Sequence, residues 1–90
     1  MFLTQSVIEG EPRLARSMIR LFDKWGADGQ DGTTLLTEKF SQQEIGEFSG
    51  LARENVNRQI KVWTEMGILR QEDRQLVLVN REALEDLADT

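Results

Sequence analysis

The sequence predicts a small α+β domain that is mostly helical and carries a short β-hairpin near its carboxyl end. Three observations support this fold class. Apolar residues recur at helical spacing over residues 11–25. A further helical segment begins at a strong capping signal at Ser41 and is interrupted at Gly50. Two β-like runs, at 68–69 and 76–79, are then joined by a polar turn.

The length and composition limit the class of protein. Ninety residues suggest one domain, and the balance of apolar and charged residues is that of a folded globular chain. The chain has no cysteine and no histidine, so disulfides, thiolate metal sites and the commonest general base are excluded. No apolar run approaches the roughly 20 residues of a membrane span, and the amino-terminal segment lacks the features of a secretory signal. We therefore expect a cytoplasmic protein with no membrane partner.

The first complete helix is expected over residues 11–25. Pro12 suits its first turn, where a missing N–H costs nothing, and Gly26 is placed to end it. One apolar stripe is formed by Leu14, Met18, Leu21, Phe22 and Trp25. Because Trp25 and the later Trp63 both fall on apolar stripes, core packing is favoured for them over ligand stacking.

The next segment, residues 27–32, is expected to be a loop because aspartate and glycine dominate it. It does not fit a calcium-binding loop, since the acidic residues of that motif are missing at the required positions. Residues 33–40 are then expected to form a short strand.

A well-marked helix start follows at Ser41. Ser41 and Glu44 have the spacing of a capping box, in which each side chain satisfies the free backbone N–H of the other. Phe40 and Ile45 occupy the two positions of a hydrophobic staple around that box. This helix is short, because the chain reaches Gly50 soon after it begins.

A second helix is expected to begin near Ala52 and to end at Gly67. Two helices joined by a three-residue turn that contains glycine form the helix-turn-helix pattern. Gly46 supports this interpretation, because a small residue there lets the second helix cross closely.

The hairpin directly after the two helices is a wing, so the predicted architecture is a winged helix-turn-helix. Its polar turn lies at Glu72–Arg74. A closing helix is expected after Asn80, which is suited to cap it, with Leu84 and Leu87 packed inward.

Placing residues 52–66 at 100° per residue separates two faces of the second helix. The expected buried face holds Ala52, Val56, Ile60 and Trp63. The exposed face of the first two turns presents Arg53, Glu54, Asn57 and Arg58. In helix-turn-helix proteins this part enters the major groove, where arginine matches guanine, glutamate accepts from cytosine and asparagine can pair with adenine. The alternative is a solvated face on which Glu54 and Arg58 form an ordinary helix ion pair.

The net charge of −5 argues against a polyanionic partner, but the distribution of the charged residues along the chain does not. Residues 1–40 hold five Lys/Arg and six Asp/Glu, and residues 41–79 again hold five and six. Residues 80–90 hold one and four, so this closing segment contributes −3 of the −5. Because affinity for phosphates follows the local field, the acidic total does not exclude nucleic acid.

The segment "FSQQEIGEFSGLARENVNRQIKVWTEMGILRQEDRQLVLVNREALEDLA" resembles the carboxyl-terminal winged helix of the Crp/Fnr family of bacterial transcription regulators. The similarity covers about residues 12–89, and its most specific part is Arg53, Glu54 and Arg58, followed by "GIL" and the wing. The resemblance implies that these three side chains contact base edges of a TGTGA-type half-site of duplex DNA. It also implies that Ser41 and Gln43 contact phosphates.

The same resemblance implies a homodimer on a palindromic operator, with RNA polymerase as a further partner. In the family, an effector-binding β-barrel and a long dimerisation helix precede the winged helix. We interpret residues 1–10 as a remnant of that helix or as a tail, and residues 11–90 as the DNA-binding domain. No cofactor is expected in this domain, and the sequence does not identify the effector of a preceding one.

Three positions depart from the family's pattern. Ala52 stands where the family usually has a capping serine, and Gln59 stands at a usually apolar, packed position. Arg74 replaces a frequent glycine of the wing turn and, with Lys61, is expected to hold the DNA backbone. The first two departures leave an alternative open, a protein-interaction module with weak or vestigial DNA binding. An enzyme is not expected, because no nucleophile, carboxylate pair or phosphate loop has a catalytic context.

Overall fold

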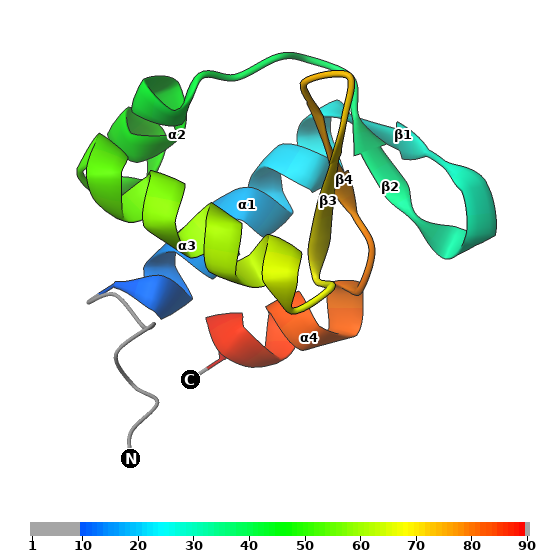
Figure 1. The fold of residues 1–90 in the computed structure, drawn as a ribbon. Coiled ribbons are helices and arrows are strands. Elements are labelled where there is room, and N and C mark those ends of the chain that lie inside the picture. Colours follow the sequence, from blue (N-terminus) through cyan, green and yellow to red (C-terminus); the bar gives the residue numbers. More distant parts are fainter. Residues whose placement is uncertain (1–9, 90) are drawn as a thin grey trace.

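The computed structural model describes residues 10–89, which form a winged helix-turn-helix (Figure 1). The expected remnant helix or tail therefore lies outside the described residues, apart from Gly10 at the start of the first helix. The elements in chain order are α1 (Glu11–Trp25), β1 (Gly26–Asp28), η2 (Gln30–Gly32), β2 (Thr34–Leu36), α2 (Gln42–Ser49), α3 (Arg53–Glu65), β3 (Leu69–Glu72), β4 (Gln75–Leu78) and α4 (Arg81–Ala88).

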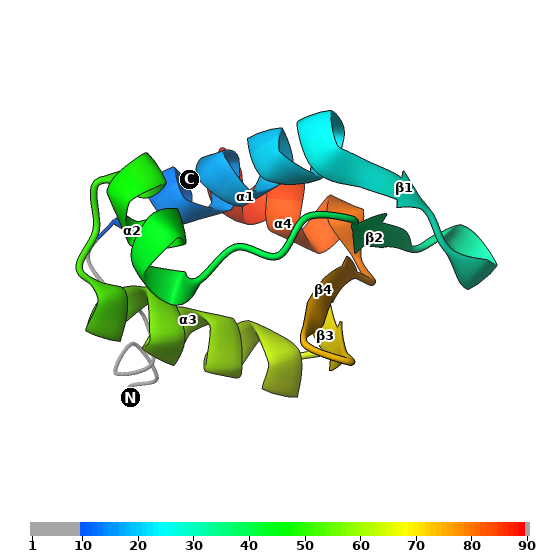
Figure 2. The same ribbon diagram turned by 90° about the horizontal axis from the view of Figure 1, so that it is seen from above.

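The helices divide the molecule into a front and a back. In Figure 1, α3 crosses the front between α2 and the upright hairpin of β3 and β4, which is the wing. Seen from above, α1 and α4 lie on the side away from α3 (Figure 2). Because α1 and α4 pack directly on each other, they form a two-helix back layer, and α3 is left with a free outer face.

The sheet has four antiparallel strands in the order β1-β2-β4-β3. The expectation of a plain loop over residues 27–32 is wrong in part, because Ala27 and Asp28 belong to β1 and pair with Leu35 and Thr34. Both β1 residues are exposed, so the strand has no apolar alternation and is formed through its backbone partner. The expected strand over 33–40 is shorter, since only Thr34–Leu36 is extended and paired.

The core lies between α1, α3, α4 and the inner face of the sheet. Trp63 of α3 is completely buried, as expected, and its indole N–H donates to Glu11 Oε2 over 3.1 Å. The largest fully buried partners around it are Phe22, Leu14, Met18, Leu36, Ile45, Leu69, Leu78 and Leu84. Since Glu11 opens α1, this hydrogen bond joins the first turn of α1 to the last turns of α3.

Trp25 does not pack in the core as expected, because it is 37% exposed. It is the last residue of α1, so the apolar stripe passes beyond the core before the helix ends. Its ring centre lies 6.2 Å from that of Phe40, and Lys24 Nζ lies 5.4 Å from the ring centre of Trp25. The Trp25 carbonyl accepts from Thr37 N at 2.9 Å and from Thr37 Oγ1 at 2.6 Å, which closes the end of the helix.

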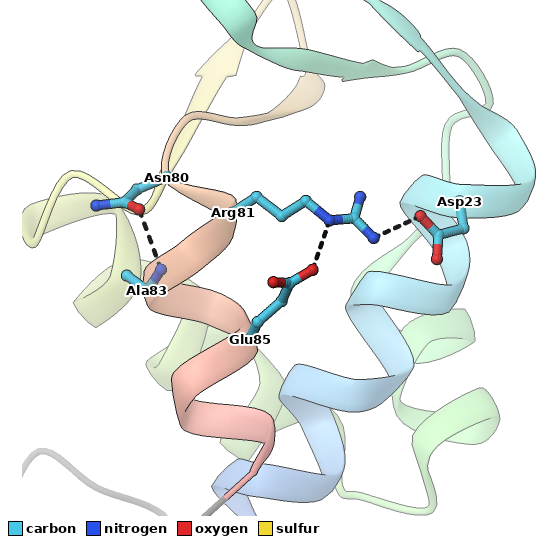
Figure 3. Close-up of polar contacts among 5 residues, drawn as sticks. All are labelled: Asp23, Asn80, Arg81, Ala83 and Glu85. Atoms are coloured by element: carbon cyan, nitrogen blue, oxygen red, sulfur yellow. Dashed lines mark hydrogen bonds and ion pairs between the residues drawn. The ribbon is translucent and has the colours of Figure 1, made fainter.

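Polar contacts join α1 and α4 at both ends of the back layer. Arg81 donates to Glu85 Oε2 at 2.8 Å and to Asp23 Oδ1 at 2.7 Å, and these bonds raise the pKa of Arg81 above its ordinary value (Figure 3). At the other end, Arg16 Nη1 donates to the Ala88 carbonyl over 2.8 Å. The expected cap of α4 is present, since Asn80 Oδ1 accepts from Ala83 N at 3.0 Å.

Candidate nucleic-acid interface

The start of α2 is built by the predicted capping box. Ser41 Oγ accepts from Glu44 N at 3.0 Å, and Glu44 Oε1 accepts from Ser41 N at 2.8 Å. Two of the free N–H groups of the helix end are thereby satisfied. The side chains of Ser41 and Gln43 are exposed at this end of α2, where the helix dipole favours a negatively charged group.

The turn between α2 and α3 is tight because two glycines meet its requirements. Gly50 has φ of 79°, a left-handed conformation that ends α2, and its N–H donates to the Gly46 carbonyl at 2.7 Å. Leu51 N donates to the same carbonyl at 2.9 Å. A Cβ atom on Gly46 would lie 2.5 Å from the Leu51 carbonyl oxygen, so only glycine fits. The predicted close approach of the two helices at Gly46 is therefore confirmed.

Helix α3 has a buried face and a free face. Val56, Gln59, Ile60 and Trp63 are buried, which holds the helix on the core along about two turns. Gln59 thus occupies a packed position, as the sequence indicated. The expectation that Ala52 is buried is wrong: it is the exposed N-cap residue with extended backbone, so the helical projection does not apply to it. Alanine also offers no side-chain acceptor to the first turn of α3.

The four candidate base-reading residues, Arg53, Glu54, Asn57 and Arg58, are all exposed in the first two turns of α3. Among the ion pairs of residues 10–89, none involves Glu54 or Arg58. The ordinary helix ion pair between these two residues is therefore not formed, and both charged groups remain available on the free face.

A shallow cleft of about 370 Å³ extends this face toward the wing. It brings Asn57 and Lys61 of α3 together with Gln42 at the start of α2 and Gln71 of β3. Its remaining lining residues are Ile60, Thr64 and Glu65. The sequence did not point to Gln42 or Gln71, because the packing of β3 beside α3 is a tertiary contact. The one local signal is strand alternation, because Gln71 lies two residues after the buried Leu69. Gln71 is nevertheless exposed, as is Arg70 before it.

Arg74 lies in the wing turn, exposed and apart from the cleft. Asp73 and Arg74 connect β3 to β4 with φ values of 51° and 70°, the left-handed pattern of a two-residue hairpin turn. Within the wing, Arg70 Nε lies 2.6 Å from Glu72 Oε2, so this acid is already partnered by a cation.

The charge of the candidate interface differs in sign from that of the chain. Its eight side chains are Ser41, Gln43, Arg53, Glu54, Asn57, Arg58, Lys61 and Arg74. They include four cations and one anion, a local charge of +3 on a chain whose net charge is −5. A local cationic field of this kind attracts phosphates even when the total charge is negative.

Two other kinds of site find no support in residues 10–89. No cluster of three or more His, Cys, Asp and Glu there is arranged to hold a metal ion. Within the same range, no helix is both long and apolar enough to cross a membrane.

Comparison with known proteins gives a consistent result. Residues 12–87 match the family model described as the Crp-like helix-turn-helix domain. The transcriptional regulatory protein btr of Bordetella pertussis is 29% identical over 87 residues, which cover 97% of this chain and 36% of btr. The structure resembles reduced CprK without ligand at 25% identity and a TM-score of 0.75, covering 90% of this chain and 38% of CprK.

A transcriptional regulator of the CRP family from Thermus thermophilus is also similar, with 25% identity and a TM-score of 0.78. The match covers 93% of this chain and 42% of that regulator. The chain therefore spans less than half the length of each of these relatives.

Proposed function

Because this chain belongs to the family of Crp-like helix-turn-helix domains, we propose that it is the DNA-binding domain of a bacterial transcription regulator and that α3 reads the major groove. One observation carries the proposal. The first two turns of α3 expose arginine, glutamate and asparagine side chains, while the opposite face of the helix is packed in the core. A rigid helix with free donors and acceptors near its start is what major-groove recognition requires.

The base-reading roles follow from the hydrogen-bonding groups. Arg53 and Arg58 each donate to the paired acceptors of guanine, and Glu54 accepts from the cytosine amino group. Asn57 lies beside the cleft and extends the readout through adenine. These pairs suit a half-site of the TGTGA type, which contains two guanines and, on the complementary strand, cytosines.

The backbone contacts come from three elements. Ser41 and Gln43 present the start of α2 to a phosphate, and Lys61 adds a cation where the cleft leads to the wing. Arg74 stands exposed in the wing turn, from which it reaches a phosphate farther along the duplex. Contacts of this class fix the register of α3 without reading sequence.

The assembly follows from the geometry of such domains. Two copies place two α3 helices about 34 Å apart, one turn of DNA, so the operator is a palindrome and the regulator a homodimer. Residues 11–90 form the DNA-binding unit of a cytoplasmic protein, and the dimerisation helix and effector domain lie toward the amino end. RNA polymerase is a further partner of the bound regulator. The domain itself needs no cofactor and performs no catalysis.

Substitution of Arg58 tests the assignment at the level of single bases. We expect Arg58→Ala, in the chain joined to a dimeric coiled coil, to lose about 1–3 kcal/mol of affinity for a TGTGA palindrome. The loss of affinity is confined to one base position. The variant therefore binds a duplex changed at that base pair, which the parent rejects. Lys61→Ala is the matched control, because loss of a phosphate contact weakens binding evenly across sequences. Unchanged affinity and base preference in Arg58→Ala would show that the assignment is wrong.

The second candidate function is a winged-helix module for protein interaction. The uncapped start of α3 at Ala52 and the net charge of −5 favour it, since both weaken binding to a polyanion. In that case the dimerised chain binds no duplex at low salt, whereas a basic partner protein binds to the acidic surface.

A further inference from the structure

The back layer of the molecule carries its charges in two opposite ridges. At 100° per residue, the cations of α1 fall within an arc of about 80°. These basic-ridge residues are Arg13, Arg16, Arg20 and Lys24, all exposed. On α4 and its C-cap residue, three of the four acids fall within an arc of about 60°, and the exposed Asp86 lies about 40° outside it. These acidic-ridge residues are Glu82, Glu85 and Asp89, also exposed. The two ridges belong to α1 and α4, the helices that lie on the side of the molecule away from α3 (Figure 2).

The two ridges run side by side in opposite directions. The Asp23–Arg81 pair marks one end and the bond from Arg16 to the Ala88 carbonyl marks the other (Figure 3 shows the first). Between them lies an open groove of about 360 Å³. Its α1 wall carries Arg16 and Arg20, and its α4 wall carries Glu85 and Asp89. Ile19 and Ala88 also line the groove and supply an apolar surface.

Much of this charge is not neutralised within the fold. Of the ion pairs formed by residues 10–89, a single one joins the two helices, between Asp23 and Arg81. Arg20 and Lys24 on the basic ridge take part in none of these ion pairs, and neither do Glu82 and Asp89 on the acidic ridge. The face thus offers two unneutralised stripes of opposite sign to a partner.

We propose that this face docks on the same face of a second copy of the chain. A two-fold axis that lies in the interface and runs along the groove brings α1 of each copy opposite α4 of the other. The basic ridge of each copy then faces the acidic ridge of the other, and the same patch serves both copies, as in an isologous dimer. A two-fold axis across the groove would instead set α1 against α1, and like charges would repel.

This contact is distinct from the dimer that binds an operator. It leaves both α3 helices on the outside and pointing in opposite directions, whereas operator binding needs both on one side of a duplex. The paired chains would therefore present two separate reading surfaces. The eight-residue helix α4 is only about 12 Å long, so the buried area is small and the association is weak and salt-sensitive.

Charge reversal on the two ridges tests the proposal through self-association. The parent chain is expected to dimerise at millimolar concentration in about 0.01 M salt and to dissociate in about 1 M salt, where the Debye length falls from about 30 Å to about 3 Å. Arg20→Glu with Lys24→Glu, and separately Glu82→Lys with Asp89→Lys, should each abolish the dimer. An equimolar mixture of the two double variants should restore it, because both contacts are again between opposite charges.

A matched control separates the ridge from the net charge. Lys39→Glu with Arg70→Glu changes the total charge as much as the α1 variant does, at exposed positions outside the back layer, and should leave self-association intact. Sedimentation velocity measures the association, and circular dichroism verifies that each variant is folded. A parent chain that stays monomeric in low salt, or a mixture that associates no better than its components, would overturn the proposal.

Discussion

Replacement of Gly46 by alanine tests how the fold positions α3. In most helices this change stabilises the protein, because alanine exceeds glycine in helix propensity by about 1 kcal/mol. At Gly46 the added Cβ atom would lie 2.5 Å from the Leu51 carbonyl oxygen and 3.6 Å from Arg53 N. Both neighbours are backbone atoms, one in the turn and one at the start of α3, so no side chain can rotate away to make room.

The magnitude follows from that distance. Ordinary contact begins near 3.4 Å, so the turn must move by about 0.9 Å to accept the methyl group. Overpacking of this kind costs about 1–3 kcal/mol. The same movement strains the bonds of 2.7 and 2.9 Å that Gly50 N and Leu51 N donate to the Gly46 carbonyl. After the gain in propensity is subtracted, we expect a net loss of up to about 2 kcal/mol in the free energy of unfolding.

Urea unfolding followed by circular dichroism measures this loss, and the midpoint should fall without a change in the slope. Glu47→Ala, at the next and exposed position of α2, is the matched control and should change stability by less than about 0.5 kcal/mol. DNA affinity should fall more than stability alone explains, because Arg53 opens α3 directly after the turn. A Gly46→Ala variant that is about 1 kcal/mol more stable than the parent would refute the close-approach reasoning.

Two further changes test local contacts. Ala52→Ser supplies the missing cap of α3 and should raise the free energy of unfolding by about 1 kcal/mol, measured by thermal unfolding; no gain would mean that the first turn is satisfied in another way. Glu11→Ala removes the acceptor of the buried Trp63 indole and should cost about 1–3 kcal/mol, whereas Glu11→Gln keeps an acceptor and should cost less. Urea unfolding compares the two, and equal losses would contradict the role of this hydrogen bond.

Features governed by local chemistry could be predicted from the sequence. The capping box of Ser41 and Glu44, the left-handed Gly50 and the Asn80 cap each depend on residues within a few positions of one another. The buried line of Val56, Ile60 and Trp63 follows from helical periodicity alone. These features together establish the helix-turn-helix and the helix that follows the wing.

The features that were missed depend on contacts that local sequence does not encode. The strand β1 consists of glycine, alanine and aspartate, and it exists because β2 returns beside it. Trp25 lies on the correct stripe but at the end of its helix, where the core has already ended. Gln42 and Gln71 join the candidate site because tertiary packing brings β3 beside α3.

The central claim is that the free face of α3 reads duplex DNA. The most direct test is the affinity of the chain, dimerised by a coiled coil, for a TGTGA palindrome and for a scrambled duplex over a range of salt concentrations. With the two phosphate contacts per copy proposed for Lys61 and Arg74, the slope of log affinity against log salt should be about −3.6, with tighter binding to the palindrome at every salt concentration. Equal affinity for the two duplexes, or no binding to either at low salt, would contradict the claim.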